Sequence, residues 1–121
     1  MTKKEAVENH RKMWRWIAEK TLDRKRQVWK DEYFEENKLD PPINDCFCCE
    51  YASQFITFDC VKCPINWENK FCTNSCYADW SHCDSYRYCA YYADLIANLP
   101  ERETEDFDIA EENENEDSGR M

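Results

Sequence analysis

Glycine is almost absent from this chain of 121 residues, since the single glycine is Gly119 near the C-terminal end. Loops that cradle a phosphate need glycine, because a Cβ atom would keep the backbone amides away from the ligand. The sequence therefore excludes P-loop and dinucleotide-binding folds. It also has no apolar run approaching the roughly 18 residues of a membrane span, nor an early apolar run typical of a secretion signal. We expect a cytoplasmic protein that does not enter a membrane.

Residue sets for catalysis are missing as well. The sequence has no His-Glu-x-x-His motif of zinc hydrolases. Zinc deaminases need a Pro-Cys-x-x-Cys motif, whereas Pro64 here follows Cys63 and no proline directly precedes Cys60. A nucleophilic pair of a cysteine with His82 is formally available, but the many cysteines around it favour ligation or packing. We expect a protein that is not an enzyme.

Negative charge is concentrated at the C-terminal end. The net charge of −10 divides into +3 for residues 1–39, −5 for residues 40–99 and −8 for residues 100–121. The stretch from Glu101 to Asp117 has little apolar surface to offset the entropy lost on ordering. We predict a folded domain over residues 1–100 and a disordered acidic tail over residues 101–121.

Apolar residues recur at helical spacing in three stretches, which cover residues 4–21, residues 24–37 and the segment from 84 to Pro100. A break is expected near Leu22 and Asp23, with Asp23 capping the second helix. Asp84 or Ser85 is expected to cap the last helix. Residues 77–80 are expected to form a short helical turn. The first helix should bury Ala6, Val7, His10, Met13, Trp14, Ile17 and Thr21.

Nine cysteines are present, an unusual number for a chain of this length. Thiols stay reduced in a cytoplasm, so metal ligation is favoured over disulfides. Two Cys-x-x-Cys turns separated by ten residues have the spacing of a tetrahedral zinc site. We predict one structural Zn²⁺, held in a small α-rich domain of about three helices by Cys46, Cys49, Cys60 and Cys63. Cys48 lies inside the first turn, so an exchange of roles with Cys46 or Cys49 stays open.

The later cysteines give a weaker metal signal. A second metal could be held by Cys72, Cys76, Cys83 and Cys89, whose spacing is acceptable for zinc. The alternative is packed thiols, because Cys89 lies on the apolar face of the last helix. His82 is interpreted as a surface or packing residue rather than a ligand.

One tryptophan lies off the apolar stripe of the first helix. Trp16, together with Arg15, Arg24 and Arg26, is predicted to contact a partner, because Trp and Arg anchor many interfaces. The alternative is that Trp16 packs on the second helix. The basic residues at this junction could also contact nucleic-acid phosphates, although the overall charge opposes this: Lys20, Arg24, Lys25, Arg26 and Lys30.

Several short motifs together resemble a family of short proteins encoded by tailed bacteriophages and prophages of Gram-positive bacteria. They are Trp14-x-Trp16-Ile17-Ala18, Tyr33-Phe34, the Cys46–Cys49 turn with Glu50-Tyr51, Cys60-x-x-Cys63-Pro64-x-x-Trp67 and Ile96-Ala97-x-Leu99-Pro100. The resemblance implies zinc at the two Cys-x-x-Cys turns. With the small size, the acidity and the lack of catalytic groups, it leads us to expect a phage protein in the host cytoplasm. Such a protein would bind a host bacterial protein, for example to inhibit a defence system. The alternatives are a nucleic-acid-binding zinc module in phage transcription or replication, and a phage assembly component.

Overall fold

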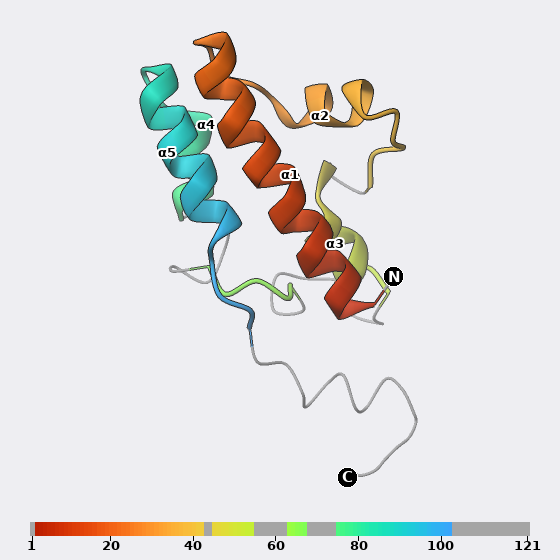
Figure 1. Cartoon of the computed structure of the whole chain (residues 1–121). Helices are drawn as coiled ribbons and strands as arrows, with labels where there is room; N and C mark the ends of the chain where they lie inside the picture. Colours follow the sequence, from red (N-terminus) through yellow and green to blue (C-terminus); the bar gives the residue numbers. More distant parts are fainter. Residues whose placement is uncertain (1, 43–44, 55–62, 68–74, 103–121) are drawn as a thin grey trace, which may run out of the picture.

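The protein is rich in α-helix. A computed structural model describes residues 2–42, 45–54, 63–67 and 75–102, and these ranges contain five helices and no strand (Figure 1). The predicted α-rich class is therefore confirmed, with two short helices added to the three expected. No helix in the described ranges combines the length and the hydrophobicity needed to cross a membrane.

Helix α1 (Lys3–Arg24) begins at a capping box. The Thr2 hydroxyl accepts a hydrogen bond from the Glu5 amide at 3.1 Å, and the Glu5 carboxylate accepts one from the Thr2 amide at 2.8 Å. These bonds satisfy two of the amides that the start of a helix leaves without partners. All seven residues predicted to be buried are buried, and Ala18 joins them. The helical spacing thus identified the inner face of α1 correctly.

The end of α1 lies later than predicted. The helix continues through Leu22 and Asp23 to Arg24, and it stops where Lys25 adopts a left-handed conformation with φ of 57°. The Lys25 amide still donates to the Thr21 carbonyl at 2.9 Å. The break near Leu22 was therefore predicted about one turn too early, because side-chain spacing does not reveal where the backbone turns.

Helix α2 (Lys30–Glu36) is shorter than the predicted helix over residues 24–37. Asp23 lies inside α1, so it does not cap α2. Instead, the Glu32 carboxylate accepts a hydrogen bond from the Trp29 amide at 2.9 Å. The link between α1 and α2 is held by the buried Thr21 hydroxyl, which accepts from the Val28 amide at 3.2 Å.

Two short helices lie in the cysteine-containing part. Helix α3 (Phe47–Ala52) follows Cys46, and helix α4 (Cys76–Ser81) covers the short turn predicted over residues 77–80. Helix α5 (Tyr86–Ala97) is capped by Ser85, whose hydroxyl accepts from the Tyr88 amide at 3.4 Å. The predicted cap of the last helix is thereby confirmed.

Helices α1 and α5 form the centre of the fold. They lie side by side and run in opposite directions, with α4 against α5 and α3 against the N-terminal half of α1 (Figure 1). The imidazole of His10 on α1 donates a hydrogen bond to the Ile96 carbonyl on α5 across a distance of 3.2 Å. Aromatic rings fill the core, and the Trp14 and Trp80 rings meet edge to face at 4.7 Å. Such edge contacts suit the charge distribution of aromatic rings.

The chain after α5 returns to the segment 63–67. Ile65 and Glu101 form an isolated antiparallel bridge, flanked by hydrogen bonds from the Asn66 amide to the Pro100 carbonyl at 2.9 Å and from the Arg102 amide to the Pro64 carbonyl at 2.7 Å. The packed part therefore extends two residues past the predicted domain end at residue 100. The predicted tail beyond Arg102 lies outside the described residues.

Candidate functional site

Four cysteine thiols form a group beside α1, which we call the thiol group: Cys46, Cys48, Cys49 and Cys63. The first three come from the start of α3, and Cys63 comes from the segment 63–67. Cys48 is fully buried and shares hydrogen bonds with the sulfurs of Cys46 and Cys63. The Cys49 thiol also hydrogen-bonds to Cys46. Two segments that are distant in sequence thus bring their sulfurs into contact.

The sulfurs of Cys46 and Cys63 receive further hydrogen bonds. The Cys49 amide donates to the Cys46 sulfur at 3.4 Å, which also starts helix α3. Cys63 accepts from Cys48, from the Ile65 amide and from the Trp67 side chain. Hydrogen bonds to sulfur stabilise the thiolate, the form that binds metal. The sequence analysis did not include Trp67 in the site, although the motif Cys63-Pro64-x-x-Trp67 places it close by.

The thiols differ in acidity. Hydrogen bonds from Cys48 and then Cys49 hold the pKa of Cys46 well below its ordinary value. The hydrogen bond from Cys48 likewise lowers the pKa of Cys63. Cys48 is the donor in both contacts, so its own pKa is raised well above the ordinary value. In this arrangement Cys48 is the thiol that keeps its proton most firmly, because it donates to both other sulfurs.

A buried histidine lies beside the thiol group. His10 packs edge to face on Trp67 with a ring distance of 6.0 Å, and it is almost fully buried. Burial lowers the pKa of His10 to about 4, against the opposing effect of the charge on Cys46. The imidazole is therefore neutral near pH 7, and its hydrogen bond goes to Ile96.

The predicted zinc ligands are only partly located. Cys46, Cys49 and Cys63 belong to the thiol group, and Cys60 lies outside the described residues. Within the described part of the chain, no three His, Cys, Asp or Glu side chains are placed as a metal site. The donor set nonetheless suits zinc, because soft sulfur ligands with N–H donors around them are typical of structural zinc sites. The zinc ion therefore stays a prediction.

Two of the four cysteines predicted to hold a second metal are joined to each other in the structure. Cys83 and Cys89 are joined by a disulfide, with a Cα–Cα distance of 5.5 Å. Cys76 is buried, and Cys72 lies outside the described residues. A disulfide offers no thiolate, so in this oxidation state two of the four predicted ligands are not available. His82 is exposed at the end of α4, as expected for a surface histidine.

The predicted partner-binding residues near Trp16 make contacts within the molecule. The Trp16 ring is half-buried and meets the Tyr33 ring of α2 edge to face at 5.3 Å. The guanidinium of Arg24 lies 5.6 Å from the centre of the Trp16 ring and is bonded to both oxygens of Glu36 at 2.6 and 2.7 Å. Trp16 thus joins α1 to α2, which is the alternative left open above, while Arg15 is exposed.

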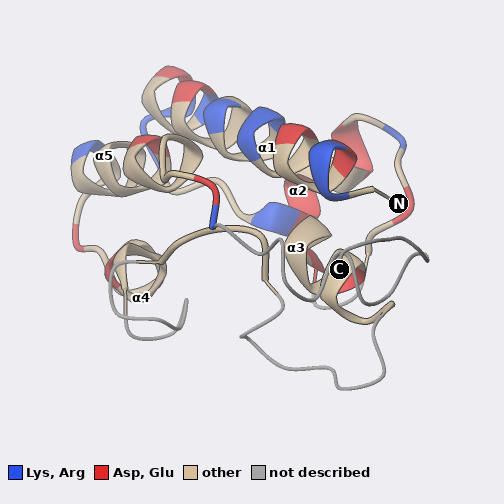
Figure 2. Ribbon diagram, turned by 90° about the horizontal axis from the view of Figure 1, so that it is seen from below, with Lys and Arg blue, Asp and Glu red and all other residues tan. Residues whose placement is uncertain are grey.

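Two of the five basic residues at the junction, Arg24 and Arg26, are paired with carboxylates. Arg26 bonds both oxygens of Glu32 at 2.7 and 3.0 Å, and Arg24 approaches the same carboxylate at 3.5 Å. These ion pairs raise the pKa of both arginines, chiefly through the side-chain hydrogen bonds to Glu36 and Glu32. Figure 2 shows Lys and Arg interleaved with Asp and Glu along the ribbon of α1.

An exposed apolar face on α5 was missed by the sequence analysis. Tyr88, Tyr91 and Leu95 are 62%, 57% and 37% exposed. Their spacing of three and then four residues places them on one side of the helix, away from the buried side with Cys89 and Ala93. The same spacing is visible in the sequence, but an analysis that follows the buried stripe does not consider a second stripe.

Comparisons with known proteins give no match to a protein-family model, to a curated protein or to a solved structure. The resemblance to phage proteins therefore stays a prediction.

Proposed function

We propose that this chain is a small binding protein whose fold is held by one structural zinc ion at Cys46, Cys49, Cys60 and Cys63. The observation that carries the zinc proposal is the contact between sulfurs from α3 and from the segment 63–67. A metal ion there would join two segments that have few helical residues of their own. Structural zinc sites are closed by four protein ligands, and a fully buried Cys48 thiol fits such surroundings.

The thin core supports the need for a metal. About 100 residues remain once the acidic tail is set aside, and domains of this size often depend on a staple. Bound zinc contributes its binding free energy to folding, because the unfolded chain has no preformed site. We therefore expect the zinc ion to stabilise the fold, and the surface of the protein to bind the target.

We propose that the target is a host bacterial protein, as the resemblance to phage proteins implies, and that inhibition of a defence system is one such activity. Protein rather than nucleic acid is favoured by the surface. The arginines that would contact phosphates are paired with Glu32 and Glu36, whereas aromatic side chains are exposed on α5. Exposed aromatic residues are typical anchors of protein interfaces.

Two measurements test this function. Elemental analysis of the folded protein should find one zinc per chain or more, and a clearly lower content in well-folded protein contradicts the zinc site. Affinity purification of the tagged protein from a Gram-positive host should recover a defined host protein at high salt. Recovery of nucleic acid instead, lost as salt rises, would favour the nucleic-acid-binding module.

A further inference from the structure

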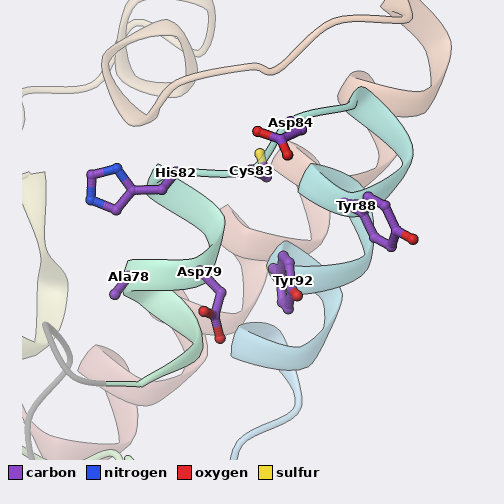
Figure 3. A pocket seen from close by; sticks show the side chains of 7 residues that line it. All are labelled: Ala78, Asp79, His82, Cys83, Asp84, Tyr88 and Tyr92. Carbon is purple, nitrogen blue, oxygen red and sulfur yellow. The ribbon is translucent and has the colours of Figure 1, made fainter.

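Helices α4 and α5 and the loop between them line an open pocket beside the exposed face of α5. Its volume is about 360 Å³, and Figure 3 shows the side chains around it. Helix α4 supplies Asp79, the loop after α4 supplies Cys83 and Asp84, and α5 supplies Tyr88 and Tyr92 one turn apart. Ala78 and His82 complete the lining, with the His82 ring turned away from both tyrosines (Figure 3).

The pocket is acidic, and its charge is not compensated within the described residues. Neither the Asp79 nor the Asp84 carboxylate has a hydrogen bond or ion pair to another described residue. Arg87 is the one basic residue of α5. Its guanidinium lies 5.5 Å from the centre of the Tyr86 ring and donates to the Tyr86 hydroxyl at 3.3 Å. Arg87 is not among the residues that line the pocket, and it forms no ion pair with Asp79 or Asp84.

Carboxylates beside aromatic rings bind cationic side chains well. A lysine or arginine gains hydrogen bonds from the carboxylates and attraction to the faces or edges of the tyrosine rings. The adjacent face with Tyr91 and Leu95 adds exposed apolar area. A ligand that matches both parts has a positive group next to apolar side chains, as many protein segments do.

The pocket has a fixed side. In the oxidised state that the structure shows, the disulfide from Cys83 to Cys89 ties the loop that carries Asp84 to helix α5, so the wall with Asp84 and the wall with Tyr88 are covalently connected. A wall held in place in this way loses less freedom when a ligand binds.

We propose that this pocket binds a lysine or arginine side chain of a partner protein, whose flanking apolar residues cover Tyr88, Tyr91 and Leu95. The inference rests on the proposed protein-binding function and names the chemistry of the partner segment. It places the main recognition surface on α5 and α4, at some distance in sequence from the Trp16 region.

The test uses two peptides and the full chain with its zinc. One peptide carries a single arginine between leucines, and the other carries citrulline, which has nearly the same shape without the charge. Binding is followed by NMR shifts of backbone amides. The arginine peptide should shift the amides of Asp79, Asp84 and Tyr88 and bind about tenfold more tightly than the citrulline peptide, a difference that shrinks as salt rises.

Substitutions identify the residues that produce the preference for the arginine peptide. Asp79→Asn combined with Asp84→Asn should reduce the affinity for the arginine peptide to that for the citrulline peptide. Asp94→Asn is the matched control, because Asp94 is an exposed carboxylate of α5 outside the pocket, and it should leave the preference unchanged. Tyr88→Ala should weaken the binding of both peptides. Thermal melting of each variant confirms that it is folded.

Equal binding of the two peptides, or shifts confined to other helices, would overturn the pocket as a cation site. If a host protein is still captured by the full chain in that case, the proposed function survives and only this surface is wrong. If the arginine peptide binds as described but no host protein is captured, the pocket stands and the proposed function fails.

Discussion

The thiol of Cys48 lies fully buried between two other sulfurs, and its role can be separated from that of Cys63. In the proposed site Cys63 is a zinc ligand, whereas Cys48 is a neighbour that donates hydrogen bonds to Cys46 and Cys63. Cys63→Ser should lose the zinc and more than about 3 kcal/mol of the free energy of unfolding, since bound metal contributes directly to folding. The zinc content and the urea midpoint measure both effects.

Cys48→Ser is the matched substitution. It should keep one zinc per chain and cost about 1–3 kcal/mol, because a smaller hydroxyl replaces a buried thiol in a packed position. A loss of zinc from folded Cys48→Ser would show that Cys48 is a ligand in place of Cys46 or Cys49. Retention of zinc in Cys63→Ser would contradict the proposed ligand set altogether.

His10 makes stability depend on pH. Its pKa is about 4 in the folded state because of burial, and ordinary in the unfolded chain. Above the ordinary value of about 6.5 both states hold the neutral imidazole, so His10 contributes no pH dependence. Between that value and about 4 only the unfolded state binds a proton, so acidification removes up to about 1.4 kcal/mol of stability per pH unit.

Denaturant titrations at pH 7 and pH 5.5 with excess zinc measure this slope. His10→Gln should flatten the dependence, although it also disturbs the hydrogen bond to Ile96. The chain has two histidines, and exposed His82 provides the control. His82→Gln removes an imidazole from the surface without touching the core around His10. Equal slopes in the natural protein and in His10→Gln would show that His10 does not titrate in this way.

At the scale of helices, Trp16 connects α1 and α2. Its ring lies between Tyr33 and the guanidinium of Arg24, and α1 otherwise shares few contacts with α2. Trp16→Ala should therefore lower the free energy of unfolding by about 2–3 kcal/mol, less than for a fully buried tryptophan. Arg15→Ala, at an exposed position of the same helix, should change it little. Chemical denaturation measures both changes. If Trp16→Ala kept its stability but no longer bound the partner protein, Trp16 would be a partner-binding residue instead.

Helical periodicity predicted the inner faces of α1 and α5 well, because their buried residues repeat in phase with the helix. It did not predict where α1 ends, which depends on the left-handed Lys25 and on the hydrogen bond of Thr21 with Val28. These are backbone contacts across a turn, and residue type alone does not specify them. The short helix α3 was not predicted, since six residues hold too few turns for a clear pattern.

At the scale of the whole molecule, cysteine spacing indicated part of the candidate site. Two thiols of one Cys-x-x-Cys turn are close by construction, so Cys46 and Cys49 were identifiable from sequence. The contact of Cys48 with Cys63 joins two separate segments, and the disulfide of Cys83 with Cys89 depends on how α4 meets α5. The pocket between those helices likewise arises from tertiary packing, which local sequence does not encode.

The last prediction concerns where the folded part of the chain ends. Two backbone hydrogen bonds tie residues 100–102 to residues 64–66, and the Lys3 ammonium donates to the Arg102 carbonyl at 2.8 Å. Pro64 and Ile65 are buried, so these bonds are partly shielded from water. A chain truncated after Arg102 should keep its zinc and its thermal midpoint within a few degrees, because nearly half of the removed residues are acidic and few are apolar.

A chain truncated after Leu99 loses both bonds beside the thiol-bearing segment. It should be less stable than the longer truncation by about 1–2 kcal/mol, the usual contribution of two such hydrogen bonds. Thermal and urea unfolding of the two truncations, with zinc content measured in each, separates the contribution of residues 100–102 from that of the residues after Arg102. Equal stability would mean that residues 100–102 are dispensable for folding, and that the domain is complete without the segment that pairs with residues 64–66. A large loss in the longer truncation would instead show that the acidic segment contributes to folding.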